Sequence, residues 1–217
     1  MLLSPDRDTY IPLAASRIVL MIRRCSSRSV FVCCFNLCIF SIQLVHYTAQ
    51  EYFNTHPEHF SDAEQEIAET CLTYLLFNDF KDGYCSTDKA LETLLQKNPL
   101  LDYAARYWAH HVHTLTVPVM EMALKFLADA SRTALSFQVI NLSPYRYSGY
   151  SQGPSKHVSG LHLCAYFGMH SIVIKMPEIQ SNIENVDVKD SRGKTPLSYA
   201  AERGHEAIVK LLHKYIN

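Results

Sequence analysis

The sequence predicts a mainly α-helical protein whose short helices pack as antiparallel pairs. Apolar residues recur at helical intervals in the middle of the chain, beginning with Ile67 and Cys71. Near the C-terminus, residues that start and stop helices stand close together: Thr195 comes directly before Pro196, and Gly204 follows. This pattern also has an earlier copy about 36 residues upstream, which indicates a repeated helix pair.

The composition argues against several classes of protein. The chain has 217 residues, enough for one or two domains, and its 20 basic side chains nearly balance its 21 acidic ones. This balance does not suggest a general binder of nucleic acid or membrane surfaces, and no basic stripe interleaved with aromatic residues is present. Seven cysteines occur without a Cys-x-x-Cys pair, which favours reduced thiols in an intracellular, cytoplasmic protein over a zinc site.

The first 43 residues differ in character from the rest. Residues 29–45 carry no charge, and arginines precede them, as in a membrane anchor with a basic flank. The run is shorter than the ~20 residues that a spanning helix needs, and polar residues interrupt it. A buried strand, or non-native sequence from a wrongly predicted exon, also fits this segment, which is then divergent or disordered.

The first two expected helices have recognisable ends. Ser61 and Glu64 have the spacing of a capping box, in which each side chain bonds to the other residue's backbone N–H. Polar residues and a glycine at 81–83 should end this helix. Either Ser86 or Thr87 then caps the second helix.

Two prolines mark the next two helices. Pro99 is expected at the first helical position, where its missing N–H has no intrahelical partner to lose. Tyr103 and Trp108 mark the buried side of this third helix. Pro118 leads into a fourth, apolar helix that includes Phe126.

The C-terminal copy of the repeated pattern has a physical reason at each position. Gly193 allows a tight turn, and Thr195 caps a helix that begins at Pro196. Gly204 can take the left-handed conformation that ends this helix. Residues 208–212 then provide the apolar stripe of a second helix.

The upstream copy aligns residues 159–168 with 195–204. In the upstream copy His162 can bond to the capping hydroxyl, and Ser198 stands at the equivalent position of the other copy. We expect the first helix of the upstream copy to be the less firmly started of the two. A proline after Met176 should end the upstream pair early and lengthen the return.

The run Asp190–Leu212 resembles an ankyrin repeat, with a departure in each copy. Where that family often has Thr-Pro-Leu-His, residues 159–162 read Ser-Gly-Leu-His and residues 195–198 read Thr-Pro-Leu-Ser. The resemblance implies a non-catalytic scaffold that binds a protein partner through its turn tips and the exposed side of the first helix of each pair. By position, the expected contact residues are Lys189, Ser191, Arg192, Tyr199, Glu202 and Arg203, with Leu163, Tyr166 and Phe167 in the first copy.

Two qualifications follow from the repeat pattern. Tyr166 and Phe167 would be an unusual exposed pair and can instead pack against the preceding helices. Repeats bury their faces only against neighbours, so two units should leave Ile208, Leu211 and Leu212 half covered.

A second resemblance covers the segment before the repeats. Residues 44–53 look like the end of a winged-helix module, named after a GPI inositol-deacylase, in fungal NACHT–ankyrin proteins. Residues 67–75 and 98–111 are similar to the helical linker of the same proteins, and residues 145–152 fit that architecture. The resemblance implies intracellular signalling through protein contacts. The nucleotide switch of those proteins is absent, since Gly193-Lys194-Thr195 has Val188 where a phosphate loop needs its first glycine.

Four segments are therefore expected: a divergent N-terminal segment at 1–43, a winged-helix remnant with helical linker at 44–140, a connecting loop at 141–158, and two ankyrin repeats at 159–217. We expect no cofactor, no metal, no small-molecule substrate and no nucleic acid.

Three different functional interpretations also fit parts of the sequence. Residues 149–153 fit the Gly-x-Ser-x-Gly elbow of a serine hydrolase centred on Ser151, with Asp187 or Asp190 and His205 or His213 following in the right order, but no apolar strand precedes the serine. A membrane-tethered adaptor would use residues 29–45, and a truncated fragment would have no function of its own. His110 and His113 have a metal-ligand spacing without a third ligand nearby.

Overall fold

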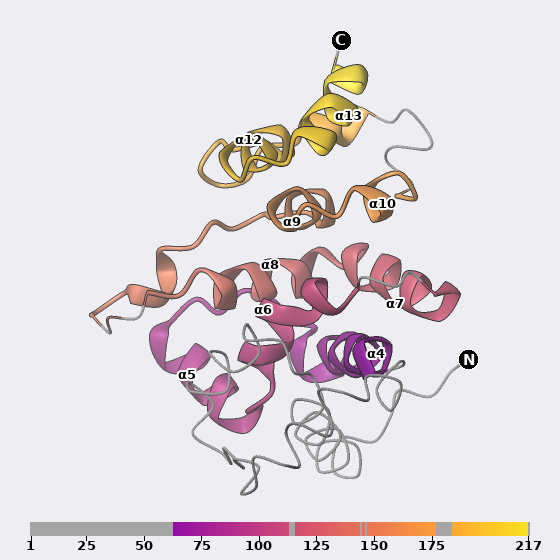
Figure 1. Cartoon of the computed structure of the whole chain (residues 1–217). Helices are drawn as coiled ribbons and strands as arrows, with labels where there is room; N and C mark the ends of the chain where they lie inside the picture. Colours follow the sequence, from indigo (N-terminus) through magenta and orange to yellow (C-terminus); the bar gives the residue numbers. More distant parts are fainter. Residues whose placement is uncertain (1–62, 113–115, 144, 146, 177–183, 217) are drawn as a thin grey trace, which may run out of the picture.

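The computed structural model describes residues 63–112, 116–143, 145, 147–176 and 184–216 (Figure 1). The expectations for residues 1–43 and 44–53, Ser61 and His113 lie outside these residues. Within them the chain is helical and contains no strand, which confirms the predicted fold class. In chain order the elements are α4 (Ala63–Leu75), the 3₁₀ turn η2 (Asn78–Phe80), α5 (Asp88–Lys97), α6 (Leu101–His111), α7 (Val117–Leu127), α8 (Ala130–Ile140), η3 (Tyr150–Gln152), α9 (Gly160–Phe167), α10 (His170–Val173), η4 (Glu184–Asp187), α12 (Pro196–Glu202) and α13 (Glu206–Ile216).

The helices are stacked in layers from α4 to α13 (Figure 1). Helix α4 packs on α6 and α7, and α6 packs on α8. Helices α7 and α8 support α9, which in turn supports α12. The two C-terminal helix pairs, α9–α10 and α12–α13, are thus the upper layers of one continuous stack.

Several helix ends match the sequence, and one start is shifted. Thr87 caps α5, since its hydroxyl accepts a 3.2 Å hydrogen bond from the Ala90 N–H. Pro99 does not occupy the first helical position, because the Leu101 N–H bonds to the Asn98 carbonyl at 3.0 Å and makes a turn there. Helix α6 consequently begins at Leu101.

Helix α4 ends earlier than the break expected at residues 81–83. Its last residue is Leu75, and η2 follows. The rings of Phe77 and Phe80 both pack against Tyr74, with centroids 5.0 and 5.6 Å away. The turn at η2 allows Phe77 and Phe80 to be buried in the core, whereas a continued α4 would place them elsewhere.

Helix α8 has no counterpart among the four expected helices. Nearly all of residues 133–139 are buried, including Thr133 and Gln138, so the sequence shows no amphipathic stripe. Asp129 caps its start by accepting from the Arg132 N–H at 3.1 Å. Its end is capped from another helix, because Arg106 donates to the Val139 and Ile140 carbonyls at 2.8 Å each.

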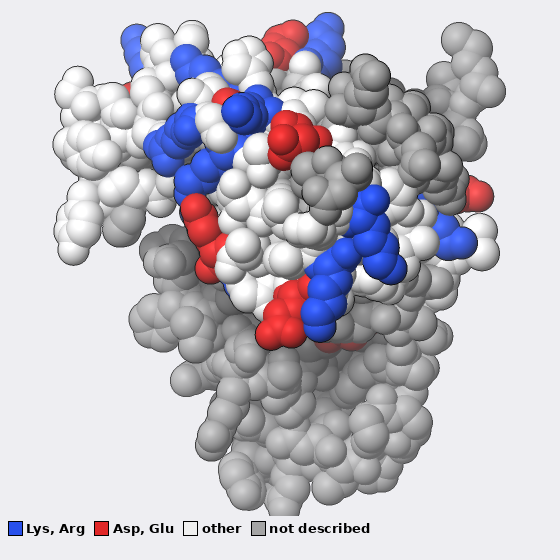
Figure 2. Space-filling model, turned by 90° about the horizontal axis from the view of Figure 1, so that it is seen from above, with Lys and Arg blue, Asp and Glu red and all other residues white. Residues whose placement is uncertain are grey.

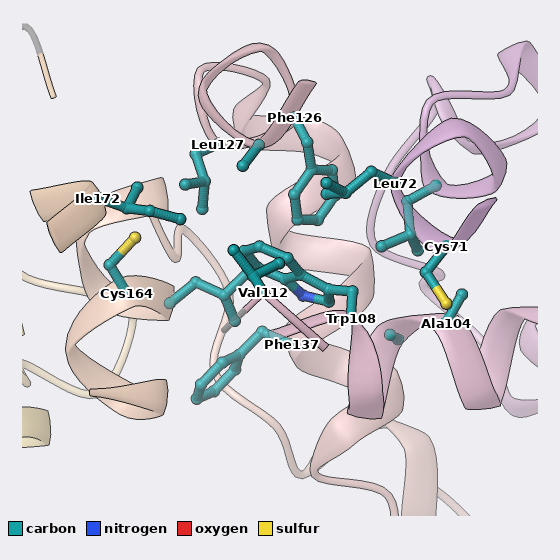
Figure 3. Close-up of a cluster of buried hydrophobic side chains, with 14 of the residues drawn as sticks. Cys71, Leu72, Ala104, Trp108, Val112, Phe126, Leu127, Phe137, Cys164 and Ile172 are labelled. Atoms are coloured by element: carbon teal, nitrogen blue, oxygen red, sulfur yellow. The ribbon is translucent and has the colours of Figure 1, made fainter. Parts of the chain in front are cut away.

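One apolar core runs through all the layers. Trp108 on α6 is fully buried at its centre and meets the Phe126 ring edge-on at 5.4 Å. Figure 3 shows Trp108 between Leu72 of α4 on one side and Val112 on the other, with Ile172 of the first repeat beyond. The core therefore joins the expected linker helices to the repeats.

Both repeats start with a reciprocal capping box, although a weaker start was expected for the first. Ser159 and His162 form a reciprocal capping box at α9, and Thr195 and Ser198 form another at α12. The Ser198 hydroxyl reaches the Thr195 N–H, at 3.4 Å, and so takes the role of the imidazole.

The expected half-exposed stripe on α13 is also corrected. Ile208 and Leu212 are 1% and 0% exposed, and only Leu211 is half-buried. Helix α13 turns these residues toward α10, α12 and η4, and its outward positions are polar, as at Glu206 and Lys210. The preceding repeat and the lengthened return therefore cover the stripe.

Candidate protein-binding surface

The turn before α12 is held by one carboxylate. Asp190 accepts hydrogen bonds from the Arg192 and Lys194 N–H groups at 2.8 and 2.9 Å, and from the Tyr199 hydroxyl at 2.6 Å. Burial alone would raise the pKa of Asp190, but hydrogen bonds from Tyr199, Ser155 and the two backbone groups hold the pKa below its usual value. The turn is consequently a rigid base rather than a loose loop.

A second turn lies beside the first. Ser191 accepts from the Lys156 N–H at 2.7 Å through its hydroxyl, and its own N–H donates to the Lys156 carbonyl at 3.0 Å. The hydroxyls of Ser155 and Ser191, which occupy equivalent positions in the two copies, lie 3.0 Å apart. The turns of successive repeats are thus joined in a row.

His162 links the two repeats from below. Its Nδ1 accepts from the Ser159 N–H at 3.2 Å, so Nε2 carries the proton and donates to the Lys194 carbonyl at 3.1 Å. Burial lowers the pKa of His162, although the Lys194 carbonyl and the charge of Asp190 act in the opposite direction. The neutral ring is the form that both hydrogen bonds require.

The structure separates the expected contact residues into exposed and buried groups. Leu163 is 0% exposed and Tyr199 is 6% exposed, so neither belongs to an accessible surface, and both expectations are corrected. Leu163 faces the core, and Tyr199 packs its ring on Phe137 and bonds Asp190. The side chains that remain exposed are Lys189, Ser191, Arg192, Glu202 and Arg203.

Tyr166 and Phe167 pack against the preceding helices. Phe167 meets Trp108 edge-on with centroids 6.0 Å apart, and Tyr166 meets Phe137 edge-on at 5.5 Å. Both are half-buried. The guanidinium of Arg203 lies over the Tyr166 ring, 3.9 Å from its centroid. This ring therefore supports an exposed cation.

Three further residues on this surface were not expected: Lys156, Tyr84 and Lys194. Lys156 lies over the Tyr84 ring, with its Nζ 5.0 Å from the centroid. Lys194 is paired with Glu202 at 2.7 Å. Lys156 was detectable, because it occupies the position equivalent to Arg192 in the repeat, whereas Tyr84 comes from a segment with no repeat signal.

Ser151 does not have the surroundings of a nucleophile. Its side chain is 0% exposed and lies on η3, without the strand that a nucleophile elbow needs. Its hydroxyl donates to Asp88 at 2.5 Å and accepts from Gln152 at 2.8 Å. The hydrogen bond from the Ser151 hydroxyl, with those from the Gly149 and Ser151 N–H groups, holds the pKa of Asp88 below its usual value, although burial acts in the opposite direction. The residue fastens the connecting loop to α5.

Two more expectations concern metal ions and membranes. Among the described residues no group of three or more His, Cys, Asp or Glu side chains could hold a metal ion. The His110 ring lies against Tyr107 and Phe167. Within the same part of the chain, no helix has both the length and the apolar character to cross a membrane.

Comparison with known proteins identifies the two upper layers. Residues 156–217 match the family profile described as Ankyrin repeats (3 copies). No curated protein matches the chain, and no solved structure does. The match begins at the first of the two joined turns and includes both helix pairs. The C-terminal part of this chain is thus similar to ankyrin repeats.

Proposed function

We propose that this chain is a non-catalytic protein–protein interaction module. The observation that carries the proposal is the row of joined turns, which presents exposed charged side chains from a hydrogen-bonded base. Ankyrin repeats are typically binding scaffolds, and a backbone that is already ordered by hydrogen bonds loses little conformational entropy when a partner binds.

The wider context of the module is also a proposal: an intracellular signalling protein of the NACHT–ankyrin type. Its support is the similarity of residues 67–75 and 98–111 to the helical linker of those proteins. The packing of α7 and α8 directly on α9 is compatible with a linker that transmits a conformational state to the repeats. Among the described residues, Cys71, Cys85 and Cys164 are free thiols.

Photo-crosslinking in cells tests the interaction. A photoreactive amino acid replaces Arg192 or Glu202 in the full chain, and in separate samples replaces Glu121 or Lys125 on α7, which are also exposed. The proposal predicts a crosslinked protein species from positions 192 and 202 that is absent from positions 121 and 125. Crosslinks from α7 alone, or none above the background without light, would exclude this surface.

A further inference from the structure

The exposed cations around the two turns form a local basic group. We use the term basic edge for Lys156, Lys189 and Arg192, all of which are exposed. Figure 2, which looks down on the α12–α13 end, shows Lys and Arg side chains on both the left and the right of this face, some of them beside Asp or Glu. The chain as a whole has a formal net charge of −1, so this group is a local feature.

The fold itself brings these cations together. Backbone pairing of Lys156 with Ser191 places Lys156 beside Arg192, although the two are far apart in sequence. Arg192 is also close enough to Tyr84 for its charge to oppose the effect of burial, which raises the pKa of that tyrosine. Lys156 lies over the same ring. Lys156 is thus in contact with the Tyr84 ring, and the charge of Arg192 acts on the same side chain.

Acidic side chains near the basic edge are largely engaged elsewhere. Asp190 lies beneath the turn, 5% exposed, and accepts from backbone N–H groups and Tyr199. Glu202 is paired with Lys194, which is not part of the basic edge. Asp187 is exposed and lies two residues before Lys189. Within the described part of the chain, none of the three cations of the basic edge forms an ion pair.

We propose that the basic edge binds an acidic segment of a partner protein, whose carboxylates lie between Lys156 and Arg192. The inference rests on the proposed interaction function and names the chemistry of its partner. Charge complementarity favours such a segment because like charges held together without counter-charges repel each other, and a carboxylate between them relieves that repulsion. Tyr84 lies beneath Lys156 and supports this cation.

Fluorescence anisotropy with the full chain tests the proposal. The probe is a labelled 12-residue peptide of alternating Glu and Ser, and the comparison peptide has Gln in place of every Glu. The edge variant carries Lys156→Ser, Lys189→Ser and Arg192→Ser. The control variant carries Lys125→Ser, Lys175→Ser and Lys214→Ser, which removes the same charge from exposed lysines elsewhere. A cooperative thermal unfolding transition in each variant serves as the check that the variant remains folded.

The acidic peptide should bind the unaltered chain more tightly than the Gln peptide does. The edge variant should weaken this binding about tenfold, since each exposed ion pair contributes little alone and three are lost, whereas the control variant should bind like the unaltered chain. Equal weakening by both variants, equal binding of both peptides, or tighter binding of a single-stranded oligonucleotide than of the acidic peptide would overturn the proposal. A protein crosslinked from position 192 would still support the interaction function in that case, so the two failures are distinguishable.

Discussion

His157 and Gly193 occupy equivalent positions in the two turns, and both have a positive φ, of +58° and +74°. A side chain beyond glycine is strained in this region by about 1–2 kcal/mol. We therefore expect His157→Gly to raise the free energy of unfolding slightly and Gly193→Ala to lower it by about 1 kcal/mol. Urea denaturation of the two variants measures this difference, and changes of the same sign would contradict it.

Gly160 allows α9 to approach α7 closely. A Cβ at this position would lie 2.3 Å from the Leu127 carbonyl oxygen, which is backbone and cannot move aside easily. We expect Gly160→Ala to lower the free energy of unfolding by about 1–3 kcal/mol. Gly153→Ala is the matched control, since its Cβ would meet only the Tyr150 carbonyl at 3.6 Å. Equal melting temperatures for the two variants would be inconsistent with the close approach.

Asp190 makes stability depend on pH. Its pKa is lower in the folded chain than in the unfolded one, so its contribution to stability is present above about pH 4 and is lost as the pH falls through the folded pKa. Asp190→Asn should be less stable than the unaltered chain at pH 7. The gap should narrow below pH 4 as the carboxylate of the unaltered chain becomes protonated. A gap that stayed constant down to pH 2.5 would show that the charge of Asp190 contributes nothing.

At the scale of elements, α8 depends on a cap supplied by α6. Arg106 donates to two carbonyls in the last turn of α8, where a cation also interacts favourably with the helix dipole. We expect Arg106→Met to lower the free energy of unfolding by about 1–2 kcal/mol. Arg106→Lys keeps the charge without the forked geometry and should lose less.

Hydrogen exchange locates the Arg106 effect. Amides near the C-terminal end of α8 should exchange faster in Arg106→Met than in the unaltered chain, whereas those of α13 should change less. Uniform acceleration across both helices would mean that the variant lowers global stability without any particular effect on α8.

For the whole molecule, the repeats depend on the layers beneath them. The core is continuous from α4 to α13, and Phe167 packs directly on Trp108 of α6. Two ankyrin repeats alone bury too little surface, since repeats obtain much of their stability from the interfaces with their neighbours. We expect residues 154–217 in isolation to lack a cooperative thermal transition by circular dichroism, and the full chain to show one. A cooperative transition in the short segment would show that the repeats are independent.

The prediction of the fold from the sequence was best where neighbours in the chain decide the structure. The capping hydroxyl of Thr195, the start of the helix at Pro196 and the left-handed turn at Gly193 all depend on side chains a few residues away. Helix α8 was missed because its residues are buried nearly all round, including Gln138, which bonds to the Cys85 and Ser151 carbonyls at 2.9 Å. No periodic pattern survives in such a helix.

The candidate surface was predictable only in part. Position within the repeat identified Lys189, Arg192 and Arg203, which the structure leaves exposed. Position within the repeat also suggested Leu163 and Tyr199, which are both buried. Leu163 faces the core, whereas Tyr199 is covered by Phe137 of α8 and by the turn carboxylate Asp190. Phe137 lies outside the repeats, so the repeat pattern alone contains no information about its contact with Tyr199.

The sequence by itself determined where helices begin and end in the repeats, and that two copies follow one another. Only the tertiary structure decided which faces stay open and which charges gather. Helix caps and turns are short-range hydrogen bonds, whose partners are fixed by spacing along the chain. Burial and the pairing of Lys156 with Ser191 arise from segments distant in sequence, and only the packed molecule brings those segments into contact.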